Sequence, residues 1–386
     1  MSRSILYLQY TNPAVYPPLE HSGSILLRSG WAVRFFGIHS EGASNELVLP
    51  EAFGGRVCLW KYQSPGARQK LHFVLFTLAA LAKALWHRPA WVYCSDTLSG
   101  PAAWLIRWLT PCRLVYHEHD SPVFDVRHPG SGFQKGLLWF RQRVGRQADL
   151  VILPNQKRLE LFQAETRRRK PSVCVFNCPR RNEVCPENRS PRRDGILRLT
   201  FHGSINAARL PVSILEAMSQ IPDRVRLSVA GYETVGAKGY VQEFLAAAQR
   251  LGLAPAVDFL GAMPHRGDIL RVAAGSEIGL AFMPLAGGDV NMQHMAGASN
   301  KPFDYLACGL ALLVSDRPEW NSMYVKPGYG LACDPAEPAS IGRVLRWFLE
   351  HPEETRQMGE RGRQRILSEW NYESQFDQVI KHLEGN

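Results

Sequence analysis

Two features that would place this protein in a membrane-spanning or secreted class are missing from its sequence. The most apolar run, LHFVLFTLAALAKALW (residues 71–86), contains His72 and Lys83 and is too short for a comfortable membrane span. It predicts a packed helix, with docking on a membrane surface as the second interpretation. The N-terminus shows no apolar segment followed by a cleavage site, so we expect no secretory signal peptide.

Paired cysteine motifs are also missing. The eight cysteines are scattered, and Cys174, Cys178 and Cys185 do not form the CxxC pairs of a zinc site. Others lie inside apolar patterns such as VYCSD and YLACG. We therefore predict reduced thiols in a cytoplasmic protein, and no metal site.

Acidic residues are scarce in the first half of the chain. Residues 1–194 contain 27 Lys and Arg against 14 Asp and Glu, whereas the remaining residues contain 18 against 21. This excess of positive charge predicts an anionic partner, such as membrane headgroups or a phosphorylated substrate, with simple solubility as the plainer alternative. The sequence has neither an aromatic-rich RNA motif nor zinc-finger spacing, so we expect no nucleic acid.

The sequence does contain a regular alternation of short apolar strands and helical patterns. A length of 386 residues favours two domains, and the alternation predicts parallel sheets covered by helices on both faces. The first series of strands is expected at residues 4–10, 31–38, 90–96, 113–119, 148–155 and 172–179. The second series is expected at residues 196–204, 225–233, 257–264, 277–284 and 311–316.

A stretch rich in Pro and Arg, residues 179–195, has no periodicity and predicts a linker. We expect an N-terminal Rossmann-like domain over residues 1–178, a C-terminal Rossmann-like domain over 196–365, and a final helix over 366–386 that packs back on the first domain. The predicted fold class is α/β, with two doubly wound domains facing each other across a cleft. Ligands of such sheets bind at the carboxyl ends of the strands.

The segment FHGSINAARLP (residues 201–211) contains the first candidate ligand site. Gly203 ends a strand, which lets its amide and those of its neighbours approach an anion, and Arg209 opens the next helix. A glycine turn, exposed amides, a cation and a helix N-terminus together predict a phosphate site. A glycine after a strand is also commonly a plain turn.

The segment SNKPFDYLACG (residues 299–309) predicts a second ligand-binding loop. Ser299 and Asn300 can cap a helix, and Pro302 suits its first turn. Asp304 is then either a plain first-turn charge, worth up to about 1 kcal/mol, or a ligand for ribose hydroxyls beside an anion held by the helix amides.

The segment VYHEHDSP (residues 115–122) ends a strand of the first domain. Strand alternation predicts that His117 and His119 point to one side and Glu118 to the other, which argues against a single metal cluster. We favour one histidine near a substrate, with the other side chains structural.

Taken in order, these segments resemble a known family. FHGSINAARLP, VDFLGAMP, SEIGLAFMP and NKPFDYLACGLALLVSDRPEW are similar to the C-terminal domain of retaining nucleotide-sugar glycosyltransferases of the GT-B fold, the family 4-like or group 1 enzymes. The first half is similar through GSILLRSGWAV, VYHEHD, ADLVILPN and VFNCP. The resemblance covers nearly the whole chain, and its specific motifs are those of the C-terminal half.

The resemblance implies that the C-terminal domain binds a nucleotide-diphosphate sugar as donor. Asp304 is the position that binds the ribose in that family, and the preceding loop supplies amides to the diphosphate. The other donor-binding residues it implies are Gly203, Ser204, Arg209, Gly261, Met263, Ser299, Asn300 and Lys301. Gly261 and Met263 belong to the segment that contacts the base.

The resemblance also implies two catalytic residues. His119 is the match for a histidine of the acceptor-binding domain, and Arg209 stabilises the leaving diphosphate. Transfer proceeds with retention of configuration and without a metal or another cofactor. An acceptor that is a saccharide or is lipid-linked, and a role in cell-envelope glycan biosynthesis, complete this expectation, with UDP favoured over GDP in the donor.

Four positions depart from the family pattern. Ser204 stands where another Arg often occurs, and the ribose acid is Asp304 rather than the commoner Glu. Ala296 stands eight residues before Asp304, where a second acid is common, and Leu210 follows Arg209 where a second basic residue is common. Lys301 or Arg266 would compensate. Two alternatives are a non-catalytic partner that binds nucleotide-sugar or glycan for another transferase, and a GT-B epimerase, which would need an acidic pair. The expected location is the cytoplasm, at the inner face of the membrane through the basic half.

Overall fold

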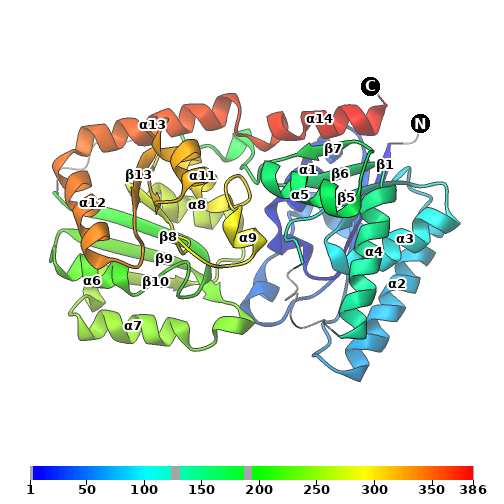
Figure 1. Cartoon of the computed structure of the whole chain (residues 1–386), viewed down its shortest axis with the longest axis horizontal. Helices are drawn as coiled ribbons and strands as arrows, with labels where there is room; N and C mark the ends of the chain where they lie inside the picture. The colour runs from blue at the N-terminus through cyan, green and yellow to red at the C-terminus, as the bar shows by residue number, and fades with distance from the viewer. Residues whose placement is uncertain (1–2, 123–130, 187–193, 386) are drawn as a thin grey trace. The chain divides into compact units, whose positions relative to one another are not determined.

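The computed structural model describes residues 3–122, 131–186 and 194–385 of the chain, and two compact units emerge from it (Figure 1). Unit 1 comprises Met1–Asn177, Asp289–Ala298 and Tyr372–Asn386, and unit 2 comprises Cys178–Gly288 and Ser299–Asn371. Each unit contains one parallel sheet flanked by helices. The predicted α/β fold class is confirmed.

Unit 1 contains a seven-stranded parallel sheet in the order β3-β2-β1-β4-β5-β6-β7. Its strands are β1 (Ser4–Gln9), β2 (Ala32–Ile38), β3 (Val57–Trp60), β4 (Trp91–Ser95), β5 (Arg113–His117), β6 (Leu150–Leu153) and β7 (Ser172–Cys174). Its helices are α1 (Pro17–Arg28), α2 (Ala67–His87), α3 (Gly100–Leu109), α4 (Gly132–Gln147), α5 (Gln156–Thr166), α9 (Val290–Gln293) and α14 (Tyr372–Glu384). The strand order reverses between β1 and β4, which is where open α/β sheets bind ligands.

Alternate residues of β1 build the two core layers of unit 1. Leu6 and Leu8 pack with Phe76 of α2 on one face, and Tyr7 packs with Phe376 of α14 on the other. Side chains of a strand point alternately to its two faces, and helices that cover both faces make the whole strand apolar. The last helix of the chain therefore completes the core of unit 1.

Unit 2 contains a six-stranded parallel sheet in the order β10-β9-β8-β11-β12-β13. Its strands are β8 (Leu197–Ile205), β9 (Val225–Glu233), β10 (Val257–Gly261), β11 (Ile278–Ala281), β12 (Ala311–Ser315) and β13 (Gly330–Cys333). Its helices are α6 (Ser213–Ser219), α7 (Tyr240–Arg250), α8 (Arg266–Ala274), α10 (Asn300–Ala307), α11 (Pro318–Trp320), α12 (Pro338–Glu350) and α13 (Pro352–Ser368). Here the strand order reverses between β8 and β11, next to the predicted phosphate loop.

Two strands, β3 and β13, lie where the apolar pattern predicts none. Each has four residues and stands at the outer edge of its sheet. An edge strand is only partly covered, so it needs no continuous apolar run, and its sequence signal is weak.

The predicted linker and the predicted final helix also differ from the structure. Glu183 accepts a hydrogen bond from Arg266 Nε at 2.8 Å, so the first part of the linker packs on unit 2; residues 187–193 lie outside the described ranges. The final helical pattern is divided into α13 and α14. The Asn371 side chain donates to the carbonyls of Ile366 and Leu367, which satisfies the free C-terminal end of α13 and stops it there.

The most apolar run of the sequence, residues 71–86, lies within helix α2. It buries Phe73, Phe76 and Ala84 in the core of unit 1, while Leu78 and Trp86 on the other side are exposed. The prediction of a packed helix is right for one face only. Within the described ranges, no helix combines the length and the apolar character that crossing a membrane requires.

Candidate functional site

The candidate site of unit 2 begins at the C-terminal end of β8. Gly203 lies inside this strand rather than after it, because β8 continues to Ile205. Its φ of +101° is a conformation that other residues rarely adopt, and a Cβ there would lie 3.2 Å from Lys301 Nζ. The glycine therefore lets the lysine approach the strand end closely.

Lys301 brings a cation from the first turn of α10 to the same place. Its ammonium group lies 5.3 Å from the centre of the Phe201 ring, and no carboxylate of the described residues is within ion-pair distance of it. Burial and the nearby charge of Arg209 lower the pKa of Lys301 to about 7, although Asp304 acts in the opposite direction. A cation held in this way is well placed to bind an anion.

Arg209 contributes the second cation. Its guanidinium donates to the Ser204 hydroxyl, and its amide donates to the Asn206 side chain at 3.1 Å. The expectation that Arg209 opens a helix is wrong: it lies in a turn, and α6 begins only at Ser213. The predicted residues Gly203, Ser204 and Arg209 are nevertheless brought together with Lys301.

Asp304 is fully buried and already has partners. Arg266 donates from both terminal nitrogens to the two carboxylate oxygens, one at 3.0 Å, and His202 Nε2 lies 3.3 Å from Oδ2. Burial alone raises the pKa of Asp304, but the charge of Arg266 and the hydrogen bond of His202 outweigh it and hold the pKa below its usual value. A role in binding ribose stays a prediction, since both oxygens are engaged.

The start of α10 contains two further predicted donor-binding residues, Ser299 and Asn300. Ser299 occupies the N-cap position, but its side chain makes no capping hydrogen bond within the described ranges. Asn300 Oδ1 is buried and has no hydrogen-bond partner among the described residues. An unsatisfied buried oxygen at a helix start is unusual and is consistent with a ligand that donates to it.

Gly261 and Met263 belong to the segment that the resemblance places against the nucleotide base. This segment ends β10 and leads into α8. Gly261 has a φ of +71°, and the chain reaches Arg266 five residues later, at the first position of α8. The segment and the Arg266–Asp304 pair are therefore linked through one short connection. Arg266 itself contacts Asp304 rather than the phosphate loop.

In unit 1, His119 lies just beyond β5 and is buried. The centre of its ring lies 3.9 Å from that of His117 and 4.8 Å from that of Tyr16, and neither of its ring nitrogens has a partner among the described residues. Burial and the charge of Arg158 lower the pKa of His119 to about 3, so the ring is neutral near pH 7. These two buried nitrogens offer hydrogen-bonding positions to a ligand.

The predicted alternation of this segment is confirmed. Glu118 is fully buried beside Tyr116 on one face of the sheet, whereas His117 contacts Tyr93 on the other. Arg141 of α4 binds Glu118 with two hydrogen bonds of 2.6 and 2.9 Å, and Tyr116 donates to it at 2.7 Å. Within the described ranges, no three His, Cys, Asp or Glu side chains are arranged to hold a metal ion.

Asp96 is a functional candidate that sequence reasoning missed. It follows β4, its Oδ1 accepts the amide of His119 at 2.8 Å, and its Oδ2 lies 3.5 Å from Gln9 Nε2 at the end of β1. Its φ of +59° is strained for a non-glycine residue. Burial, followed by the charge of Asp120, raises the pKa of Asp96 to about 7. Strain and a shifted pKa at the strand reversal are typical of a functional site.

Ala296 belongs to unit 1, whereas Asp304 belongs to unit 2. Its carbonyl accepts from the Asn155 side chain at 2.7 Å, and Asn177 donates from its backbone amide to Gly297 at 2.8 Å. Gly297 has a φ of +82°. The segment Asp289–Ala298 is thus a short excursion of the chain that docks on unit 1.

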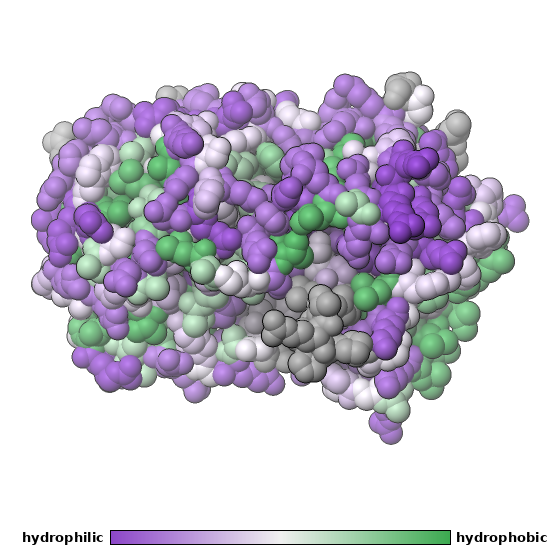
Figure 2. All heavy atoms as spheres, in the orientation of Figure 1, coloured by the Kyte–Doolittle hydropathy of each residue, from purple (hydrophilic) through white to green (hydrophobic). Residues whose placement is uncertain are grey.

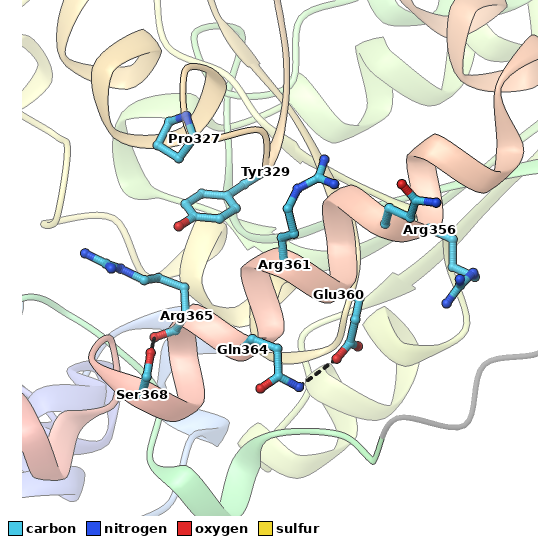
Figure 3. A pocket seen from close by; sticks show the side chains of 9 residues that line it. Pro327, Tyr329, Arg356, Glu360, Arg361, Gln364, Arg365 and Ser368 are labelled. Carbon is cyan, nitrogen blue, oxygen red and sulfur yellow. Dashed lines mark hydrogen bonds between the residues drawn. The ribbon is translucent and has the colours of Figure 1, made fainter.

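A cavity of about 590 Å³ lies elsewhere on unit 2, between α13 and the turn before β13 (Figure 3). Tyr329, Arg361 and Arg365 are among its lining residues. Arg361 donates to the Gly328 carbonyl, and Arg365 pairs with Glu369. None of the predicted donor-binding residues lines this cavity, so it is separate from the candidate site.

Comparison with known proteins agrees with the two-unit organisation. Residues 209–381 match a family model described as glycosyl transferase-like, and residues 20–179 match one described as a glycosyl transferase 4-like domain. The two matches together cover most of the chain. Among curated proteins, none matches the sequence significantly.

Several solved structures share the fold at low sequence identity. HepE from Anabaena, in complex with UDP and glucose, is 17% identical over 100% of both chains, with a TM-score of 0.73. Sucrose-phosphate synthase from Thermosynechococcus elongatus is 16% identical over 99% of this chain and 100% of that chain, with a TM-score of 0.72. WaaG, a glycosyltransferase involved in lipopolysaccharide biosynthesis, is 14% identical over 99% and 100%, with a TM-score of 0.69.

Proposed function

Because the chain belongs to the glycosyltransferases of the GT-B fold, we propose that unit 2 binds the diphosphate of a nucleotide-diphosphate sugar at Gly203, Arg209 and Lys301. The observation that supports this most is the lysine ammonium beside the glycine, with a second cation close enough to lower its pKa. Two crowded cations are unfavourable in the empty protein, and a bound anion would relieve their repulsion.

A UDP-sugar is the favoured donor, and a GDP-sugar is the alternative. The structures of HepE hold UDP, UDP with glucose, or UDP-glucose, and they share the fold of this chain. The buried oxygen of Asn300 adds a local argument, since a ribose hydroxyl or a base N–H can donate to it. In this proposal Asp304 binds the ribose only if Arg266 shares or releases its carboxylate.

The proposed reaction replaces one bond at the anomeric carbon of the donor sugar. The bond to the diphosphate oxygen breaks, and the acceptor oxygen forms a bond on the same face, so that configuration is retained. The leaving diphosphate gains negative charge, which Arg209 and Lys301 stabilise, and it takes the proton of the acceptor hydroxyl. The reaction needs neither a pair of catalytic carboxylates nor a metal ion.

The acceptor is proposed to bind unit 1, at the buried polar place formed by His119, Asp96 and Arg158. The neutral ring of His119 can accept a hydrogen bond from a sugar hydroxyl. The guanidinium of Arg158 has two nitrogens without partners among the described residues. We propose a saccharide or lipid-linked acceptor and a role in cell-envelope glycan biosynthesis. WaaG, which acts in lipopolysaccharide biosynthesis, has the same fold.

A second candidate function is a non-catalytic protein that binds nucleotide-sugar for another transferase. The observation that favours it is Ala296, which occupies in unit 1 the position where an acid is common in the family. An epimerase is less well supported, because Asp304 and Glu183, the two acids described beside Arg266, are both engaged by its guanidinium.

Thermal unfolding with UDP, GDP and their sugars tests donor binding. A ligand present at about a hundredfold excess over its Kd stabilises the native state by about 2.7 kcal/mol. We expect UDP and a UDP-sugar to raise the Tm of the wild type but not of Arg209→Ala or Lys301→Met. Lys238→Met, which removes an exposed lysine of unit 2, is the matched control and keeps the shift. Equal shifts in all variants would contradict the site.

Transfer is then measured with the nucleotide-sugar that binds. Incubation with a pool of saccharides and extracted glycolipids should yield a glycosylated product whose anomeric configuration, read by NMR, equals that of the donor. Inversion would refute the retaining mechanism. Binding of UDP with neither transfer to any acceptor nor donor hydrolysis would favour the non-catalytic function.

A further inference from the structure

Helix α2 presents an apolar face to solvent along its whole length. Its exposed large side chains recur with helical spacing and fall on one side, opposite the buried Phe73 and Phe76. They are Leu71, Val74, Leu75, Leu78, Leu85 and Trp86. Leu71 is 60% exposed and Trp86 is 85% exposed. A surface helix of a globular protein normally turns polar residues outward, so this face is a departure that needs an explanation.

The neighbouring helices α3 and α4 extend the same apolar area. Trp108 and Leu109 of α3 and Phe133 and Trp139 of α4 are exposed as well. The helices are joined by ring contacts: Phe73 of α2 lies 5.4 Å from Phe133, and Trp104 of α3 lies 5.7 Å from Trp139. Figure 2 shows hydrophobic side chains gathered at the edge of the molecule where Figure 1 draws α2 and α3. We call this area the three-helix surface.

The charge of these elements is of one sign. No Asp or Glu occurs in residues 52–95, 97–117 or 131–148, which include all three helices. The basic residues of the helices are Arg68, Lys70, Lys83, Arg107, Lys135, Arg141, Arg143 and Arg146. Of these, only Arg141 is fully buried, in its pair with Glu118. The positive charge of the first half is therefore concentrated around an exposed apolar surface.

We propose that the three-helix surface docks on an anionic lipid bilayer, with the apolar side chains in the headgroup region and the Lys and Arg side chains on lipid phosphates. Leucines with tryptophans on one face and only cations beside them are the composition of a helix that lies in a membrane interface. A patch of this kind is rarely left open to water by a soluble protein. Negatively charged headgroups complement it, because no acid of these helices repels them.

This inference does not rest on the proposed transfer reaction. It concerns helices of unit 1 only, and binding to vesicles can be measured without donor or acceptor. If it is correct, the protein binds its membrane whether or not unit 2 is occupied.

Vesicle flotation of the full chain tests the proposal. We expect the protein to float with vesicles of phosphatidylcholine and phosphatidylglycerol, and to bind much less to pure phosphatidylcholine or at high salt, since each basic residue near the surface contributes about fivefold in affinity. Leu75→Glu with Leu78→Glu should abolish flotation. Leu161→Glu on α5, which changes another exposed leucine of unit 1, is the control and should float. Equal flotation of all three proteins would overturn the proposal.

A second measurement follows the fluorescence of the wild-type protein, with a mild aromatic variant as its control. Trp86 is the most exposed tryptophan, and brominated acyl chains should quench its fluorescence, with the effect reduced in Trp86→Phe. Light scattering without lipid tests the alternative occupant of this surface, a second copy of the chain. If the wild type is a dimer that Leu75→Glu dissociates, and vesicles neither bind nor quench, the surface is an interface between two copies of this chain and the proposal is wrong.

Discussion

Arg266 binds the buried carboxylate of Asp304 through both of its terminal nitrogens, which ties α8 to α10 in unit 2. Glu183 accepts from the Nε of the same guanidinium at 2.8 Å, so one arginine joins three segments of the unit. The residue that the family pattern assigns to ribose is therefore also the centre of an ion-pair network. A substitution of Asp304 therefore changes the stability of unit 2 as well as any contact with a ligand.

Removal of one partner of this pair should destabilise unit 2 strongly. We expect Asp304→Asn to lower the free energy of unfolding by about 3 kcal/mol, because the buried Arg266 would keep only Glu183 as a counter-charge. Arg266→Met should cost a similar amount, and the double variant less than the sum of the two. Urea denaturation measures all three. Additive losses would show that the two side chains do not act as a pair.

The same pair predicts a sign for acid stability. The pKa of Asp304 is held below its usual value, so its contribution is complete above the unfolded pKa of about 4 and is lost as the pH falls through the lowered native pKa. Wild-type protein should therefore lose stability in acid more steeply than Asp304→Asn. Parallel acid profiles of the two proteins would contradict the lowered pKa.

Lys301 should make donor binding depend on pH near neutrality. Its pKa of about 7 means that the empty protein is only partly charged there, whereas a diphosphate favours the charged form. We expect the Kd for UDP-glucose to rise as the pH increases above about 7. UDP-glucose is the suitable ligand, because its diphosphate is esterified at both ends and does not titrate in this range.

The control for this prediction is Lys301→Arg. An arginine stays charged at any pH of the experiment, so its Kd for UDP-glucose should be nearly constant where that of the wild type rises. Calorimetric titration at several pH values measures both proteins. A wild-type Kd that does not change with pH would show that Lys301 does not bind the diphosphate.

Much of unit 2 could be predicted from the sequence because its signals are local. A glycine near the end of β8 and a lysine in the first turn of α10, the helix that leads into β12, need only a parallel sheet to bring them together. Gly203 and Lys301 do meet. The pairing of Asp304 with Arg266 could not be predicted, since it depends on how α8 packs against α10, which no local pattern describes.

The candidate site of unit 1 was harder to predict for a related reason. Asp96 becomes interesting only when β4 is known to lie between β1 and β5, which places it beside Gln9 and His119. The apolar pattern predicts which segments are strands, but it does not predict their order in the sheet. The docking of Ala296 on unit 1 depends likewise on a side chain, Asn155, that is far away in sequence.

Asp96→Asn should separate stability from acceptor chemistry. Burial raises the pKa of Asp96 to about 7, so the ionised carboxylate destabilises the native state above its unfolded pKa and stability grows as the pH falls toward it. We expect the neutral variant to be more stable at high pH by about 1–3 kcal/mol, as each pKa unit is worth about 1.4 kcal/mol before solvent screening.

If Asp96 binds the acceptor, the same variant should transfer more slowly. We expect a lower kcat/KM for the acceptor, together with loss of the decline in rate that the wild type shows below about pH 7. The Kd for UDP-glucose should not change, because Asp96 belongs to unit 1 and the donor residues to unit 2. An unchanged acceptor rate would assign Asp96 a structural role only.

Gly297 tests whether the segment Asp289–Ala298 belongs to unit 1. A Cβ at this position would lie 2.5 Å from a carbon of the Phe176 ring and 2.9 Å from the Pro154 carbonyl oxygen, and its φ is +82°. Gly287 has a similar φ of +76° but no atom within 4 Å of an added Cβ. We expect Gly287→Ala to cost only the backbone strain, about 1–2 kcal/mol, and Gly297→Ala to cost more, because the ring and the carbonyl must also move. Thermal unfolding compares the two variants. Equal losses would mean that Gly297 does not pack on Phe176, and that the excursion of the chain onto unit 1 contributes little to its stability.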